Sequence, residues 1–288
     1  MVQVIRAESA GFCMGVDLAL RKLERLVQNG PAAAPVCTLG PIIHNPQVLK
    51  HYADLGVQEI AEPEELPRKS SAVIRAHGIP RDVQDKLAKR GVHIVDATCP
   101  KVKKAQMLIH DRTAKGERSL ILFGEPEHPE VAGLLSYAGG EATVIEAVDH
   151  FERLSLDPEE DYVLAAQTTQ DRTEYNRLIS RVQEVLGSEV PVLDTICDTT
   201  RERQREAADI AACADAMVVV GGYNSGNTRR LVQVVRSLGT PCHHVEQAHE
   251  LAPEGFAAAQ AIGLTAGAST PKEIIDAVEA RLHSFFDD

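Results

Sequence analysis

The sequence predicts an α/β protein: a pseudo-threefold trefoil of three small domains with parallel-type sheets around one centre. Short apolar segments alternate with helical stretches, which is typical of parallel sheets covered by helices. A unit of cysteine, helix, apolar segment and polar loop recurs three times at intervals of about ninety residues. The chain has 288 residues, more than one hydrophobic core usually holds. We therefore predict lobes at 1–95, 96–193 and 194–288.

Each unit opens with a cysteine and continues with two polar loops in a similar register. The cysteines are Cys13, Cys99 and Cys197. The first loops carry His44, His128 and Ser225, and the second loops carry His77, Thr168 and Ser269. A register kept in three copies predicts that three thiols and six loops converge on one site.

A helix is expected directly after each of these cysteines. The first is predicted by an apolar stripe at helical spacing, formed by Val16, Leu20, Leu23 and Val27. Pro100 suits the first position of the second helix, so Thr98 or Cys99 caps it, and Thr199 and Thr200 are candidate caps of the third. The dipole and free N–H groups of a helix N-terminus favour a thiolate, the form that binds metal.

Six short apolar segments predict the main strands. They span 34–39, 71–76, 119–123, 162–166, 216–220 and 261–265. In parallel sheets, ligands bind where loops leave the carboxyl ends of the strands. The loops there offer imidazole, hydroxyl and amide groups beside helix N-termini, which suits a phosphate or diphosphate without any Lys or Arg.

Glu130, two residues after His128, is the carboxylate that we select as a proton donor. An acid in a first helical turn that complements the dipole would explain it about as well.

The remaining cysteines and histidines lack the register of the repeat. Cys37 and Cys213 are expected to be packing residues. Cys242 beside His243 and His244 forms a weak metal-like cluster, which we discount as a site. Solvated or structural roles are expected for six histidines, namely His51, His93, His110, His150, His249 and His283.

Composition restricts the class of protein. A chain that is 44% hydrophobic and 25% charged is typical of a globular protein, and a net charge of −12 argues against nucleic acid or an anionic membrane as a partner. The N-terminus lacks the features of a signal peptide, so we expect a cytoplasmic protein whose cysteines stay reduced. Three cysteine ligands then fit either a zinc ion with a water or a [4Fe-4S] cluster with one open iron.

Several motifs together resemble the LytB-type hydroxymethylbutenyl diphosphate reductases, and the likeness runs from residue 11 to about residue 270. The motifs are Gly-Phe-Cys, Gly-Pro-Ile-Ile-His-Asn, Ala-His-Gly, Asp-Ala-Thr-Cys-Pro, His-Pro-Glu-Val, Gln-Thr-Thr, Asn-Ser-Gly-Asn and Thr-Ala-Gly-Ala-Ser. The resemblance implies reductive dehydroxylation of (E)-4-hydroxy-3-methylbut-2-enyl diphosphate to isopentenyl and dimethylallyl diphosphate, the last step of the non-mevalonate pathway. It also implies a ferredoxin or flavodoxin as electron donor.

The resemblance also assigns roles to residues. A [4Fe-4S] cluster would be held by Cys13, Cys99 and Cys197. Glu130 would supply protons with help from Thr168. The diphosphate would be bound by His44, His77, His128, Ser225, Asn227 and Ser269, with Thr168 close to the substrate.

Three positions depart from the pattern of the family. Gly226 stands where a serine that contacts the diphosphate is common, so this chain either uses the backbone N–H there or lacks that bond. Glu127 stands where a glycine is common before the histidine, and it would weaken diphosphate binding if it pointed inward. Asp198-Thr199 replaces the residue pair that more usually follows the third cysteine.

Two other functions remain open at this point. A cluster-dependent dehydratase acting on a phosphorylated alcohol would remove water without an electron carrier. An iron–sulfur or zinc sensor would bind a partner, but it would not require Glu130, Thr168 and three histidines in converging loops.

Overall fold

The computed structural model describes residues 2–29, 34–157 and 159–286. Within these residues the strands form three sheets, and every pairing between the named strands is parallel. The chain divides into two compact units. Unit 1 comprises Met1–Asp17, Ile43–Tyr52 and Asp198–Asp288, and unit 2 comprises Leu18–Ile42 and Ala53–Cys197.

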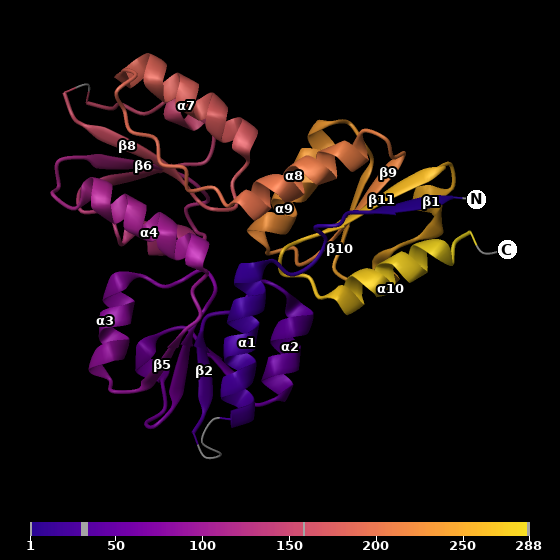
Figure 1. Ribbon diagram of the computed structural model, residues 1–288, viewed down its shortest axis with the longest axis horizontal. Helices are drawn as coiled ribbons and strands as arrows, with labels where there is room; N and C mark the ends of the chain where they lie inside the picture. Colours follow the sequence, from indigo (N-terminus) through magenta and orange to yellow (C-terminus); the bar gives the residue numbers. More distant parts are fainter. Residues whose placement is uncertain (1, 30–33, 158, 287–288) are drawn as a thin grey trace. The chain divides into compact units, whose positions relative to one another are not determined.

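The first sheet lies in unit 2. Its strand order is β3 (Gln58–Ile60), β2 (Val36–Leu39), β4 (Ser71–Ile74) and β5 (His93–Asp96). The helices between the strands of this stretch of sequence are α1 (Met14–Asn29), α2 (Pro46–Asp54), α3 (Arg81–Lys89) and the short 3-10 turn Pro63–Glu65, and most of α2 belongs to unit 1. Cys37, Leu39 and Ile74 pack with Leu87 of α3 in one apolar cluster, so α3 covers one face of this sheet (Figure 1).

The second sheet also lies in unit 2 and has the order β7 (Ala142–Ile145), β6 (Ser119–Phe123) and β8 (Tyr162–Ala166). Its helices are α4 (Pro100–Thr113), α5 (Pro129–Leu135), α6 (Val148–Phe151) and α7 (Arg172–Leu186). Ile121 and Phe123 of β6 pack with Tyr175 of α7, whereas Leu120 packs with Ile109 of α4. Alternate residues of one strand thus face different helices, and α4 and α7 lie on opposite faces (Figure 1).

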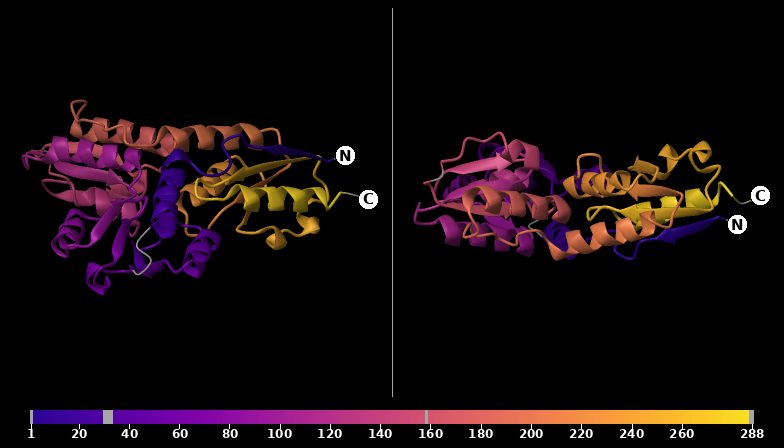
Figure 2. Two further views of the ribbon diagram at one scale, coloured as in Figure 1. Left: turned by 60° about the horizontal axis from the view of Figure 1, so that its bottom comes forward. Right: turned by 90° about the horizontal axis from the view of Figure 1, so that it is seen from above.

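The third sheet lies in unit 1 and has the order β1 (Gln3–Arg6), β11 (Ala261–Ala266), β9 (Ala216–Val220) and β10 (Cys242–Val245). Helices α8 (Asp198–Ala211), α9 (Gly226–Ser237) and α10 (Lys272–His283) accompany it, with 3-10 turns at Ala248–Glu250 and Pro253–Phe256. Val218 packs with Ile275 of α10, and Val219 packs with Ala207 of α8. The yellow α10 and the orange α8 therefore lie on opposite sides of the sheet (Figure 2, left).

The predicted class is confirmed, because the protein is α/β with three parallel sheets. All six predicted strands are present, as β2, β4, β6, β8, β9 and β11. Five strands were missed, namely β1, β3, β5, β7 and β10, and each lies at the edge of its sheet. These five strands are only partly buried, so they lack the continuous apolar run that marks a buried parallel strand such as β8.

One strand lies in a different sheet from the one that its place in the sequence suggests. Residues 3–6 fall in the first predicted lobe, but they form β1 and pair with β11 of the third sheet. Sequence proximity does not determine this pairing, because the partner is more than 250 residues away. The boundaries at 95/96 and 193/194 stay predictions.

Two local predictions were wrong. Helix α8 begins at Asp198, so Thr199 and Thr200 lie inside its first turn and do not cap it. Cys213 is exposed and not a packing residue, because α8 ends at Ala211 and leaves it in the following turn. Cys37 is fully buried in β2, as expected. The six histidines outside the repeat are exposed or half-buried.

Candidate functional site

Each of the three repeat cysteines makes the same kind of backbone hydrogen bond. In each case the cysteine N–H donates to the carbonyl of the second residue after a strand of the adjacent sheet. The bonds join Cys13 to Ala268 after β11 (3.1 Å), Cys99 to Ala76 after β4 (2.9 Å) and Cys197 to Thr168 after β8 (2.9 Å). The repeat seen in the sequence is therefore also a repeat of local geometry, and it fixes each cysteine beside a loop at a carboxyl strand end.

Cys13 belongs to unit 1 and directly precedes α1. The N–H of Val16 points at its sulfur, with 3.5 Å between the two atoms, and the N–H of Asp17 donates to its carbonyl at 2.9 Å. A sulfur that accepts a hydrogen bond from the first turn of a helix is placed where negative charge is stabilised.

Cys99 belongs to unit 2 and is the N-cap of α4. Pro100 follows at the first helical position, and the N–H of Lys103 donates to the Cys99 carbonyl at 3.0 Å. The predicted cap is thus confirmed, with Cys99 and not Thr98 in the capping position. In the described part of the chain none of the six cysteines forms a disulfide, and Cys13, Cys99 and Cys197 are each half-buried.

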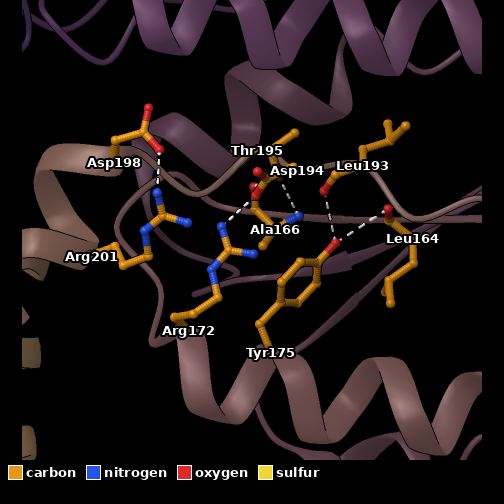
Figure 3. Close-up of polar contacts among 9 residues, drawn as sticks. All are labelled: Leu164, Ala166, Arg172, Tyr175, Leu193, Asp194, Thr195, Asp198 and Arg201. Atoms are coloured by element: carbon orange, nitrogen blue, oxygen red, sulfur yellow. Dashed lines mark hydrogen bonds and ion pairs between the residues drawn. The ribbon is translucent and has the colours of Figure 1, made fainter. Parts of the chain in front are cut away.

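Cys197 is held by the segment that precedes it, which runs alongside β8 (Figure 3). Leu193 N–H donates to the carbonyl of Leu164 at 2.8 Å, and Tyr175 Oη donates to the carbonyl of Leu193 at 3.0 Å. The hydroxyl of Thr195 accepts from the N–H of Ala166 at 2.8 Å and donates to its carbonyl at 2.6 Å. The buried Thr195 hydroxyl thus hydrogen-bonds the segment to β8 two residues before Cys197.

Glu130 lies in the first turn of α5 and is only 1% exposed. Burial raises its pKa to about 7, although hydrogen bonds from Thr168 favour the charged form, and the negative charge of Glu125 adds to the upward shift. One carboxylate oxygen, Oε1, accepts the N–H of Thr168 at 2.7 Å. A buried carboxyl with a pKa near neutrality can hold a proton and release it, which is what a general acid requires.

Thr168 connects the acid to a cysteine. Its N–H donates to Glu130, and its carbonyl accepts the N–H of Cys197. The residue is 4% exposed and lies in the loop after β8. Unit 2 therefore brings together three of the predicted site residues through the backbone of a single residue.

Two of the predicted histidines also meet in unit 2. The rings of His77 and His128 stand edge to face, with their centroids 5.3 Å apart. His128 is the N-cap of α5, and its Nδ1 accepts the N–H of Glu130 at 3.1 Å. An accepting Nδ1 carries no proton, so the neutral ring holds its proton on Nε2 and can donate from there. Glu127, one residue earlier, is exposed.

The predicted anion-binding residues of unit 1 lie at the N-terminus of α9. Ser225 is the N-cap, and its hydroxyl accepts the N–H of Thr228 at 3.3 Å. Gly226 is the first helical residue, with a backbone N–H that no helical carbonyl can accept. Asn227 is 8% exposed, and its Nδ2 lacks a hydrogen-bond partner among the described residues.

Ser269 and His44 also meet within unit 1. Ser269 Oγ donates to the carbonyl of His44 at 3.3 Å. The same carbonyl lies 2.6 Å from the position that a Cβ would take at Gly222, so only glycine allows the loop before α9 to approach this closely. Asn45 follows His44 and caps α2 by accepting the N–H of Val48 at 3.0 Å.

Sequence reasoning missed Thr195 and Arg203. Thr195 gave no signal, because its partner Ala166 lies on β8, at a distance of 29 residues in the sequence. Arg203 did give one: it occupies the stripe of α8 that Thr200, Ala207 and Ile210 mark as buried. An arginine in such a stripe indicates a buried cation with a dedicated set of acceptors.

The comparison with protein families settles the relationship of the chain. The family model described as LytB protein matches residues 4–283. This chain belongs to the LytB family. The resemblance drawn from the motifs is therefore confirmed, whereas the roles of individual residues stay predictions.

Curated members of the LytB family are similar over their whole length. A 4-hydroxy-3-methylbut-2-enyl diphosphate reductase of Nitratidesulfovibrio vulgaris (strain DP4) is 54% identical, with 98% of this chain and 100% of the relative covered. The Aquifex aeolicus protein of that name is 38% identical, with 98% and 96% covered.

Two solved structures of the family resemble the protein. One is described as (E)-4-hydroxy-3-methyl-but-2-enyl diphosphate reductase, the terminal enzyme of the non-mevalonate pathway. It is 37% identical with a TM-score of 0.70, covering 99% of this chain and 100% of that one. The Plasmodium falciparum E-1-hydroxy-2-methyl-but-2-enyl-4-diphosphate reductase is 24% identical with a TM-score of 0.90, covering 96% and 86%, and shows that the fold is shared.

No helix in the described residues is both long and apolar enough to span a bilayer.

Proposed function

We propose that this chain reduces (E)-4-hydroxy-3-methylbut-2-enyl diphosphate to isopentenyl and dimethylallyl diphosphate, the last step of the non-mevalonate pathway. The observation that carries the proposal is the buried Glu130 carboxyl, joined through Thr168 to Cys197. Hydroxide is a poor leaving group, so its removal requires a Brønsted acid beside a Lewis acid and an electron source. The names of the full-length relatives support the same substrate.

The cysteines fit an iron–sulfur cofactor, which we propose to be one [4Fe-4S] cluster. Cys13, Cys99 and Cys197 would hold it, because each is a half-buried cysteine beside the start of a helix. The hydrogen bond from Val16 to the sulfur of Cys13 is of the kind that stabilises a ligating thiolate. With three protein ligands, the bound cluster would supply an open Lewis-acidic iron and electrons delivered one at a time.

The diphosphate would be bound without lysine or arginine. In unit 1, the Ser225 hydroxyl, the Gly226 N–H, the Asn227 amide and Ser269 supply donors, with His44 from the loop before α2. The buried Nδ2 of Asn227 supports this role, since a buried amide donor without a protein acceptor costs free energy unless a ligand satisfies it. In unit 2, His128 can donate from Nε2, and His77 lies against it.

Proton delivery would come from Glu130. Cleaving the C–O bond takes two electrons and two protons, one to carry hydroxide away as water and one to form the new C–H bond. Because the pKa of Glu130 is about 7, the carboxyl is partly protonated at neutral pH and can take up a new proton after each transfer. The Thr168 N–H holds the carboxyl in place, and Thr168 itself would assist at the substrate.

The proposal includes an external reductant and a compartment. Single electrons would come from a protein of the ferredoxin or flavodoxin class. The six cysteines, none of which forms a disulfide in the described residues, fit a reducing compartment, which we take to be the cytoplasm.

The decisive experiment is anaerobic turnover of the alcohol diphosphate with reduced methyl viologen, on protein whose iron and sulfide have been quantified. Formation of both five-carbon diphosphates is expected. Cys99→Ser should lose both iron and turnover, while Cys213→Ser, which changes an exposed cysteine, should keep them. An intact four-iron protein that forms neither product would refute the proposal and favour a dehydratase or a sensor.

A further inference from the structure

Arg203 is an arginine in the interior of unit 1. It lies in α8 and is only 2% exposed, although a guanidinium is among the costliest groups to bury. None of the roles proposed above uses this residue. A charge kept at such a cost needs a specific set of acceptors, and here the acceptors indicate what the residue does.

Two acceptors of the guanidinium are backbone carbonyls from segments far apart in the sequence. Nη1 donates to the carbonyl of Ala266 at 2.7 Å, and Nη2 donates to the carbonyl of Gly11 at 3.0 Å. Gly11 lies two residues before Cys13, and Ala266 ends β11 two residues before Ala268, which accepts the N–H of Cys13. The same two segments are therefore linked twice. Arg203 links Gly11 to Ala266, and two residues further along each segment the Cys13 N–H bonds to Ala268.

The conformation of Gly11 supports this reading. Its φ is +113°, a region that side chains rarely adopt, so the glycine allows a turn directly before Phe12 and Cys13. The turn presents the Gly11 carbonyl to Arg203. Without Arg203, the turn before Cys13 would lose the hydrogen bond between the guanidinium and the Gly11 carbonyl.

Glu206, one helical turn after Arg203, holds the beginning of the same segment. Its two carboxylate oxygens accept the N–H of Glu8 at 2.6 Å and the N–H of Ser9 at 3.0 Å, and one of them also accepts the Ser9 hydroxyl. Burial alone would raise the pKa of Glu206, but these hydrogen bonds and the nearby charge of Arg203 lower it overall. One face of α8 therefore holds residues 8–11 from both ends.

We propose that Arg203 is a positioning residue for the Cys13 thiolate, acting by fastening the Gly11 turn to the end of β11. The inference rests on the proposed function in that Cys13 is taken as a cluster ligand. Arginine suits this task better than lysine, because its planar fork reaches two carbonyls at once whereas an ammonium acts as a point charge. We expect the loss of the fork to release Cys13 while the rest of unit 1 stays folded.

The test compares cysteine reactivity within one protein. Full-length chains with Arg203→Met and Arg203→Lys are purified anaerobically, treated with an iron chelator and iodoacetamide, and digested. Mass spectrometry then gives the labelling rates of Cys13, Cys99 and Cys242. Cys242 reports on the folding of unit 1, because it is half-buried in β10 and burial raises its pKa to about 11. Arg205→Met is the matched control, since Arg205 is an exposed arginine of the same helix.

Arg203→Met removes both guanidinium hydrogen bonds and should raise the labelling of Cys13 relative to Cys99 and Cys242 by at least about tenfold, the factor expected when the bond to Gly11 alone is lost. Arg203→Lys should give a smaller increase, and Arg205→Met should match the parent chain. Unchanged Cys13 labelling, or a parallel rise of Cys13 and Cys242, would overturn the inference, the second because Arg203 would then support the whole unit. The ratio is measured whether or not the purified chain carries iron, so failure of the proposed function is seen separately, in the iron and turnover of the parent chain.

Discussion

Replacing Glu130 with glutamine should make the stability of the protein less dependent on pH. Burial raises the pKa of this carboxyl from 4.5 to about 7, so the folded state binds the proton more tightly than the unfolded state does. Its contribution to the free energy of unfolding is therefore fully present below pH 4.5 and is lost as the pH rises through about 7. At 1.36 kcal/mol per pKa unit, the loss between about pH 5 and pH 8 is roughly 2 to 3 kcal/mol.

Glutamine cannot ionise, but its amide oxygen can still accept the Thr168 N–H. The variant should therefore be more stable relative to the parent at pH 8 than at pH 5, by about that amount. Urea unfolding of the reduced, iron-free chain, followed by circular dichroism because the sequence contains no tryptophan, measures the difference. Glu127→Gln is the matched control, since Glu127 is exposed in the same loop and should not alter the pH dependence.

Turnover gives a second measure of the same residue. The activity of the parent should fall as the pH rises through about 7, because Glu130 then loses its proton. Glu130→Gln should bind the substrate yet turn over at least roughly a hundredfold more slowly, without this descending limb. A stability difference that does not change with pH would refute the assigned pKa, and near-normal turnover would remove Glu130 from the role of proton donor.

Three further predictions concern the surroundings of the site. Thr195→Val keeps the shape but leaves the N–H and carbonyl of Ala166 without their hydroxyl partner, so urea unfolding should show a loss of about 2 kcal/mol, and an unchanged midpoint would contradict this. Gly222→Ala would place a Cβ 2.6 Å from the His44 carbonyl, so the loop must move, and calorimetry should show weaker binding of inorganic pyrophosphate. Asn227→Ala should weaken pyrophosphate binding by about tenfold, the scale of a hydrogen bond to a charged ligand. Gln233→Ala, an exposed change in the same helix, should leave that affinity as it is, and equal affinities of both variants would rule out a contact by Asn227.

The central strands and the cysteine positions could be predicted from the sequence because their signals are local. A buried parallel strand is a continuous apolar run, as in 216–220, and a helix that starts after Cys13 shows its stripe within a few turns. The loops with His77, His128 and Ser225 follow from the same reasoning, since a polar segment between a strand and a helix must lie at the carboxyl end of that strand.

Edge strands and helix ends were predicted less well. Strand β10 contains Cys242, His243 and His244 and is only partly buried, so its composition resembles that of a loop. The start of α8 at Asp198 depends on the backbone that leads into it, and the two threonines that follow give the same signal whether they cap the helix or lie inside it.

The sequence by itself determined the class of the fold, the threefold recurrence of cysteines and polar loops, and the residue types available for catalysis. Only the tertiary structure decided which strand completes the third sheet, how far Glu130 is buried and which carbonyls receive Arg203. Each of these depends on groups that are distant in the chain: β1 pairs with β11, Glu130 meets Thr168, and Arg203 reaches Gly11. A pattern of neighbouring residues records what a segment can form, whereas the pKa of a buried acid and the partners of a buried cation are set by what the folded chain packs around them.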